Sequence, residues 1–171
     1  MTDEDVRRLL ARPDKKVIRP SHWSIQPGGH EPSIYVFESG IAVGLEVLEG
    51  VFVRASYRAE KLIRRRAAEV LVPPKFDCAL FFESNRIAAI DTKQGQIHEN
   101  KVGEGHPYYG MTLRATTHEH IWTGTCGYVE PIEPPVLDVL ELLQLFAKRC
   151  NLTFLDSFDH PLRGSQASLP L

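Results

Sequence analysis

Short β-rich runs separated by turn residues fill the region between residues 22 and 57 and predict β-strands, and in the last run one face is apolar and the other partly basic. The predicted strands are His22–Gln26, Ser33–Glu38, Ile41–Leu48 and Val51–Tyr57. Glycine-containing turns such as Ser39-Gly40 and Glu49-Gly50 separate them, which favours an antiparallel meander. The alternation places Arg54 and Arg58 together on one face of the last strand, opposite its apolar residues.

The strand pattern returns in the second half of the chain. Asp77–Glu83 and Arg86–Asp91 are predicted strands, and Ser84-Asn85 joins them as a two-residue hairpin turn. Further strands are predicted at Met111–Thr116, His118–Trp122 and Cys126–Glu130. Residues 92–110 are rich in glycine, proline and polar residues, and they predict a long functional or mobile loop.

Three segments have the pattern of helices. Thr2 is a suitable N-cap for a short helix that Pro13 ends. Residues 59–70 are rich in good helix formers and predict a second short helix, with a long ordered loop as the alternative. A helix from Pro134 or Pro135 to Cys150 has a broad apolar face, which we expect to pack on the sheet or partly on another subunit.

These elements predict an α+β fold: a curved antiparallel sheet packed by a long C-terminal helix, with a small N-terminal helix beside it. We expect residues 1–162 to form a single domain, because their length suits one core. Residues 152–158 would add an edge strand. The tail, residues 163–171, has a composition typical of disorder.

Composition narrows the class of protein. The formal net charge is −2 and 43% of the residues are hydrophobic, which is ordinary for a globular protein and excludes a polycation. No apolar stretch has the length of a membrane span, and the acidic start differs from a secretory signal, so we expect a cytoplasmic protein with no membrane partner. Cys78 and Cys150 suit a core position, whereas Cys126 is a candidate ligand or nucleophile.

A dense group of histidines carries the candidate chemistry. Four of the seven histidines lie between residues 98 and 120. In an extended strand His118 and His120 share one face, so one divalent transition metal could bind both, with Asp91 as a carboxylate ligand. His98 or His106 could supply a third nitrogen from the covering loop, as a catalytic zinc or iron site requires. The alternative is a partly exposed polar face whose rings bond to backbone or water.

The same histidines could act without a metal, as general base and general acid on a phosphodiester. Between residues 54 and 75 the chain has seven basic and two acidic residues, and Arg54 and Arg58 are candidates to hold the anion. Aromatic residues near the histidines, Tyr108, Tyr109 and Trp122, could stack on a base. A solvated charged surface and ordinary packing are the alternatives for these two groups.

We therefore favour an enzyme or ligand-binding protein for a phosphorylated or nucleotide-like substrate. As an enzyme it would be a phosphodiesterase-like or nuclease-like hydrolase that depends on His98, His106, His118 and His120. The 54–75 segment could contact a nucleotide or nucleic acid. The alternative is a non-enzymatic interaction module, such as an inhibitor or antitoxin-like protein, and the C-terminal helix could contact a protein partner or a second copy.

Overall fold

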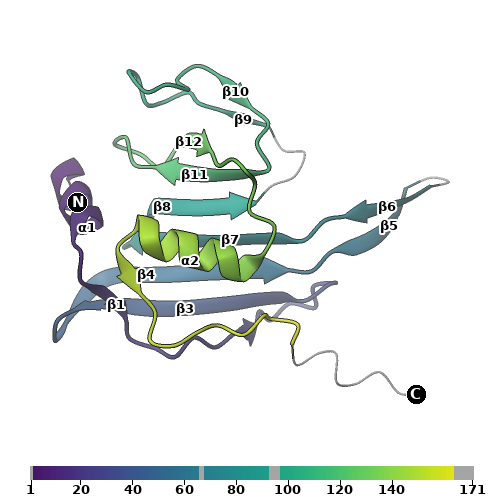
Figure 1. Cartoon of the computed structure of the whole chain (residues 1–171), viewed down its shortest axis with the longest axis horizontal. Coiled ribbons are helices and arrows are strands. Elements are labelled where there is room, and N and C mark those ends of the chain that lie inside the picture. The colour runs from purple at the N-terminus through teal and green to yellow at the C-terminus, as the bar shows by residue number, and fades with distance from the viewer. Residues whose placement is uncertain (1, 66–67, 93–96, 164–171) are drawn as a thin grey trace.

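In the computed structural model, which describes residues 2–65, 68–92 and 97–163, a nine-stranded sheet forms the body of the molecule (Figure 1). Eight of its strands follow the order β12-β11-β8-β7-β4-β3-β1-β13, and the ninth, β2, also pairs with β3. Neighbouring strands are antiparallel except for β1 and β13. The strands are β1 (Lys15–Val17), β2 (Ser24–Ile25), β3 (Ile34–Val43), β4 (Glu46–Arg58), β5 (Lys61–Arg65), β6 (Ala68–Val72), β7 (Lys75–Phe82), β8 (Asn85–Thr92), β9 (His98–Glu99), β10 (Thr112–Leu113), β11 (Thr117–Ile121), β12 (Tyr128–Pro131) and β13 (Leu152–Thr153).

The predicted N-terminal helix is confirmed as α1 (Asp3–Ala11). Thr2 caps it with a capping box, in which the Thr2 hydroxyl accepts from the Asp5 N–H and the Asp5 carboxylate accepts from the Thr2 N–H. At its other end the fully buried Lys15 donates to the carbonyls of Leu9, Leu10 and Arg12. The Leu9 carbonyl also accepts from the Arg12 N–H, and the lysine adds a donor for the last carbonyls of the helix, so it supports the helix C-terminus and joins α1 to the first strand.

The first strands are longer than predicted. β3 runs through the predicted Ser39-Gly40 turn, with a register shift between Gly40 and Ala42, and β4 runs through the predicted Glu49-Gly50 turn. The chain reverses instead at Gly44-Leu45, where Gly44 has a φ of 59° that favours glycine. The four predicted runs are therefore one short strand and a long hairpin, because β3 and β4 pair along almost their whole lengths.

The helix predicted over residues 59–70 is wrong. β5 and β6 form a hairpin there that continues the β4–β7 pair outward from the body (Figure 1), and Leu62 pairs with Leu71. Each residue of this hairpin whose burial is described is exposed or half-buried. Arg66, part of the predicted basic segment, lies outside the described residues.

The C-terminal helix, α2 (Val139–Arg149), is shorter than predicted. The Asp138 side chain accepts from the N–H groups of Leu140 and Glu141, so the helix begins after Asp138. Before it, the N–H groups of Ile132 and Val136 both donate to Thr117, the first residue of β11, and the predicted proline-containing first turn is not helical. Four residues of α2 are buried: Val139, Leu142, Leu143 and Phe146.

The predicted α+β fold, with a curved sheet and a long C-terminal helix, is therefore wrong. The structure is 44% strand and 13% helix, its two helices in the described residues are short, and its sheet is not curled. The predicted edge strand is reduced to β13, which pairs in parallel with β1. Most of the predicted disordered tail, residues 164–171, lies outside the described residues.

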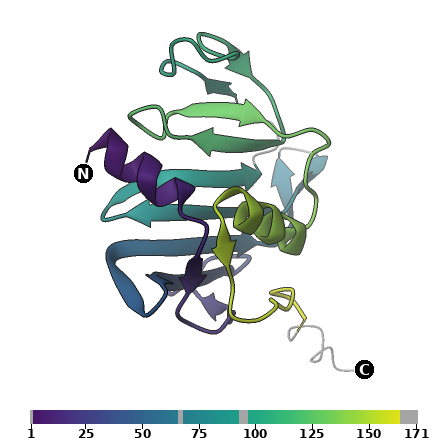
Figure 2. The same cartoon turned by 60° about the vertical axis from the view of Figure 1, so that its left-hand side comes forward.

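One face of the sheet holds the apolar core. Residues of both helices form one buried cluster with the row Ala55, Cys78 and Ile90 from β4, β7 and β8. Figure 2 shows the two helices in front of the sheet. Successive residues of a strand point to opposite faces, so the next row lies on the face away from the helices. No helix in the described part of the chain is long and apolar enough to cross a membrane.

Candidate metal centre

The polar row on the helix-free face brings the predicted ligands together. Ser56, Asp77, Asp91 and His118 are register partners across the adjacent strands β4, β7, β8 and β11. His120 lies two residues beyond His118 and shares its face, as the His-x-His spacing predicts. Asp91, His118 and His120 therefore converge although 27 residues or more separate the carboxylate from the imidazoles along the chain.

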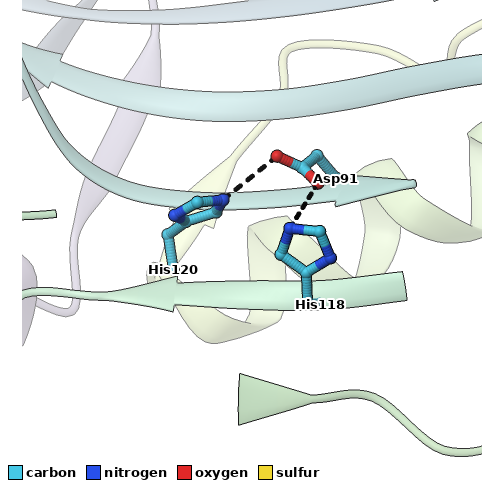
Figure 3. Close-up of side chains that lie close together, drawn as sticks. All are labelled: Asp91, His118 and His120. Carbon is cyan, nitrogen blue, oxygen red and sulfur yellow. Dashed lines mark hydrogen bonds and ion pairs between the residues drawn. The ribbon is translucent and has the colours of Figure 1, made fainter. Parts of the chain in front are cut away.

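The three side chains are in direct contact (Figure 3). His118 Nε2 lies 2.8 Å from Asp91 Oδ1, and His120 Nε2 lies 3.1 Å from Asp91 Oδ2. All three residues are buried, with exposed fractions of 2% for Asp91, 4% for His118 and 3% for His120. Each offers a ligand atom within 4.8 Å of the others, so this group could hold a metal ion.

Charges and hydrogen bonds define the protonation of the group. Burial alone would raise the pKa of Asp91, but the contacts with His118 and His120 outweigh it, and the pKa falls well below its usual range. Burial lowers the pKa of His120 despite the opposing effect of Asp91. The site is thus a carboxylate bridging two imidazoles.

His120 has two competing partners at its other nitrogen. Arg86 Nη2 lies 3.1 Å from His120 Nδ1, and the carbonyl oxygen of Cys126 lies 3.3 Å from the same atom. The guanidinium can only donate, so its hydrogen bond favours the tautomer with the proton on Nε2, facing Asp91. The Cys126 carbonyl can only accept, so it favours the opposite tautomer, in which Nε2 has a free lone pair.

His98 lies beside the buried pair. Its ring centre is 5.9 Å from that of His118 and 5.8 Å from that of His120, which are themselves 5.1 Å apart. His98 Nε2 lies 3.0 Å from the carbonyl oxygen of Gly127. Three of the four predicted histidines therefore lie together, although His98 is outside the group whose ligand atoms all fall within 4.8 Å.

His98 belongs to residues 97–113, here called the 97–113 segment, which contains β9 and β10 and lies beyond the β12 edge of the sheet (Figure 1). The fully buried Asn100 anchors it by accepting from the Val129 N–H and donating to the Val129 carbonyl, both at 2.8 Å. The Tyr128 hydroxyl accepts from the Tyr108 N–H at 3.2 Å. The predicted loop is thus a docked segment with a short hairpin.

The fourth predicted histidine and the aromatic residues lie elsewhere. His106 is exposed and its ring packs on Tyr128, 4.7 Å between centres. The Trp122 indole N–H donates to Asp3 at the start of α1. Tyr108 is half-buried, and Tyr109 is 45% exposed. These contacts of His106, Tyr108 and Trp122 are thus with Tyr128 and Asp3 and not with the two buried histidines.

The arginines predicted to bind an anion, Arg54 and Arg58, do not lie beside the Asp91, His118 and His120 group. Arg54 is on the same face as His120 but three strands away, with Ala79 and Ala89 between them. Arg58 donates to the Glu31 carbonyl at 2.8 Å. The basic residue at the group is Arg86, which the sequence analysis did not single out.

The cysteines agree with the core prediction. Cys78 and Cys150 are buried in the apolar cluster, and burial raises the pKa of Cys150 to about 12. Cys126 is half-buried, and burial raises the pKa of its thiol as well, despite the neighbouring Arg86. In this structure its contact with the histidine group is made by its backbone carbonyl.

Comparisons of the chain with protein-family models, with curated proteins and with solved structures find no match.

Proposed function

We propose that this protein binds one divalent transition-metal ion through Asp91, His118 and His120. The observation that carries the proposal is the convergence of one carboxylate and two imidazoles, all buried, from two neighbouring strands. Imidazole and carboxylate ligands suit zinc, iron and related metals. Zinc is the first ion to test, because it forms stable sites with this ligand set.

The distances support the proposal. Two ligand atoms on one tetrahedral ion with bonds of about 2.0–2.1 Å lie roughly 3.3 Å apart. The two observed nitrogen–oxygen distances, 2.8 and 3.1 Å, are close to this spacing, although they involve the two different oxygens of Asp91. All three ligand atoms lie within 4.8 Å of one another, so binding one ion would draw them together by roughly an ångström or less per side chain. The 5.1 Å between the ring centres of His118 and His120 also agrees with the roughly 5 Å expected for two histidines on one ion.

Orienting groups are present for the metal-bound tautomer. A metal-binding histidine usually donates its other N–H to a carbonyl or carboxylate. The Cys126 carbonyl is placed for this role at His120 Nδ1. Binding through Nε2 requires the Arg86 guanidinium to leave Nδ1, because that nitrogen then carries the proton.

The test is metal analysis of the full chain purified without a histidine tag, followed by Zn²⁺ titration after treatment with a chelator. We expect about one ion per chain. Asp91→Asn and His118→Ala should each weaken Zn²⁺ binding by more than the roughly 10–100-fold that removing a supporting residue costs. His106→Ala is the matched control, since it removes an exposed histidine outside the ligand group.

Circular dichroism of each variant shows whether it has kept its fold. A folded wild-type chain that takes up no ion from Zn²⁺, Fe²⁺, Mn²⁺ or Co²⁺ would contradict the proposal. Equal affinity in the wild type and in the double variant His118→Ala, His120→Ala would also contradict it, because the ion would then be bound elsewhere.

The hydrolase with a phosphorylated or nucleotide-like substrate stays a prediction. The metal proposal does not depend on this hydrolase activity. The three proposed ligand residues have exposed fractions of 4% or less, which favours tight retention of an ion over direct access by a substrate. The interaction module, its protein or nucleic-acid partner and oligomerisation through α2 also stay predictions. The apolar residues of α2 that are buried pack in the core of the same chain.

A further inference from the structure

We infer that His98 is a further ligand of the proposed ion, so that metal binding fastens the 97–113 segment to the sheet. This inference rests on the proposed function, because it concerns the same ion. It adds a third imidazole from a segment outside the main sheet. The resulting set of three histidines and one aspartate would complete a four-coordinate site, which is the usual form of a structural zinc centre.

The hydrogen bond of His98 selects the tautomer that a ligand needs. The Gly127 carbonyl can only accept, so His98 donates its Nε2–H to it, at 3.0 Å. In the neutral ring the lone pair is then on Nδ1. The carbonyls of Cys126 and Gly127, which are consecutive residues, thus lie at one nitrogen each of His120 and His98. This arrangement is the backbone support that metal-binding histidines commonly have.

The spacing of the three rings supports a shared ion. Ring centres of two histidines on one tetrahedral ion lie about 5 Å apart, or slightly more at wider angles. The observed separations of His98 from His118 and His120 are 5.9 and 5.8 Å. Since His98 lies outside the tight ligand group, binding would draw its ring inward by roughly an ångström.

Because the 97–113 segment is already anchored to β12, a small movement of the His98 ring is sufficient for it to reach the ion. Asn100, two residues from His98, is fixed to both backbone groups of Val129, and Val129 pairs with His120 in the sheet. The backbone on each side of the ligand group is therefore positioned before an ion binds. Such preorganisation lowers the entropy cost of adding a ligand from a second segment.

The experiment compares wild type, His98→Ala and the matched control His106→Ala, which lies in the same segment and outside the cluster. We expect His98→Ala to weaken Zn²⁺ binding about 10–100-fold and His106→Ala to change it less than about twofold. With Co²⁺, His98→Ala should shift the visible absorption spectrum, because water then replaces an imidazole in the fourth position. Hydrogen exchange should show that saturating Zn²⁺ protects residues 97–113 in wild type and in His106→Ala, but not in His98→Ala.

The conservative variant His98→Gln and a circular-dichroism spectrum guard against misfolding of the alanine variant. If wild type binds no ion, the proposed function itself is wrong. If binding depends on Asp91, His118 and His120 while His98→Ala keeps the wild-type affinity, Co²⁺ spectrum and Zn²⁺-dependent protection, only the inference about His98 is overturned.

Discussion

The Arg86 guanidinium and the Cys126 carbonyl favour opposite tautomers of His120. Arg86 Nη2 donates to His120 Nδ1, which favours the ring proton on the nitrogen that faces Asp91. It also places a positive charge beside the proposed cation. We therefore predict that Arg86→Met raises the Zn²⁺ affinity by about tenfold or more, because it removes both the charge repulsion and the competing donor.

Isothermal titration of the two proteins measures this effect. Arg114→Met is a suitable control, because Arg114 is an exposed arginine outside the contacts of the site. An unchanged or lower affinity in folded Arg86→Met would show that the guanidinium supports the metal-bound form and does not oppose it.

Asp77 provides a pH-dependent test one strand from the ligands. Burial raises the pKa of Asp77, and the charge of Asp91 adds to this, against the hydrogen bond from Ser56. A carboxyl with a raised pKa in the folded state stabilises the fold below its unfolded pKa of about 3.9, and loses that contribution as pH rises through the folded value.

We therefore predict that Asp77→Asn gains stability relative to wild type as the pH rises from about 4 to 7, by on the order of 1 kcal/mol. Urea unfolding in the presence of a chelator measures the difference at each pH. A difference that is constant, or that falls over this range, would show that the carboxyl is not destabilised by its surroundings.

The core of the site could be predicted from particular residues. The His118-Glu119-His120 spacing places two rings on one face of any strand, and Asp91 ends a strand whose apolar pattern is clear. The partners Arg86 and Asn100 have no comparable local signal, because their roles depend on which strands are neighbours. Which strands are neighbours, and in which register they pair, is decided by long-range packing and is known only from the structure.

Alanine substitutions at two glycines of the 97–113 segment distinguish the effect of backbone strain from the effect of a steric overlap. Gly103 and Gly105 have φ values of +88° and +87°, so alanine is strained at both. A Cβ at Gly103 would lie 2.6 Å from Cδ2 of Tyr128, whereas one at Gly105 would meet nothing within 4 Å. The segment thus touches β12 at Gly103.

We predict that Gly103→Ala undocks the segment and Gly105→Ala does not. The common strain costs about 1–2 kcal/mol, and only Gly103→Ala adds the overlap with the Tyr128 ring. Hydrogen exchange of residues 97–113 should therefore be faster in Gly103→Ala than in Gly105→Ala. Equal exchange in the two variants would mean that the contact with Tyr128 does not hold the segment.

At the scale of elements, residues 59–70 show where local propensity fails. Alanine, glutamate, lysine and arginine favour a helix there, yet β5 and β6 extend a hairpin ladder that β4 and β7 have already aligned. Apolar residues then pair across the hairpin, as Ile63 does with Val70. Propensity is a weak prior, and the neighbouring ladder overrides it.

For the whole molecule, an ion that binds only the folded state must raise its stability. At a free Zn²⁺ concentration of 100 times Kd the gain is about 2.7 kcal/mol. For a chain of this length each kcal/mol raises Tm by about 2–4 °C, so we predict a rise of roughly 5–10 °C. Scanning calorimetry with Zn²⁺, and then with excess chelator, measures it.

The rise should disappear in the double variant His118→Ala, His120→Ala and be reversed by the chelator in wild type. A similar rise in both proteins would show that Zn²⁺ stabilises the fold through other groups.

The arrangement of the strands in the sheet could be predicted from the sequence less well than the individual strands. The aliphatic and aromatic run of β7 and the turn that follows it identified β7 and β8 with nearly the correct ends. The parallel pairing of β1 with β13 joins segments from opposite ends of the chain. No local pattern encodes such a pairing, since its stability comes from packing that exists only after the sheet has assembled.

The buried lysine at the end of α1 also gives the chain a chemical reporter. Lys15 is 0% exposed, whereas Lys16, Lys61, Lys75, Lys101 and Lys148 are exposed or half-buried. An amine-acylating reagent added to the folded chain would therefore modify those lysines and leave Lys15 intact. Since its ammonium group is released only when α1 separates from β1, the rate of Lys15 acylation would measure how often the N-terminal helix opens.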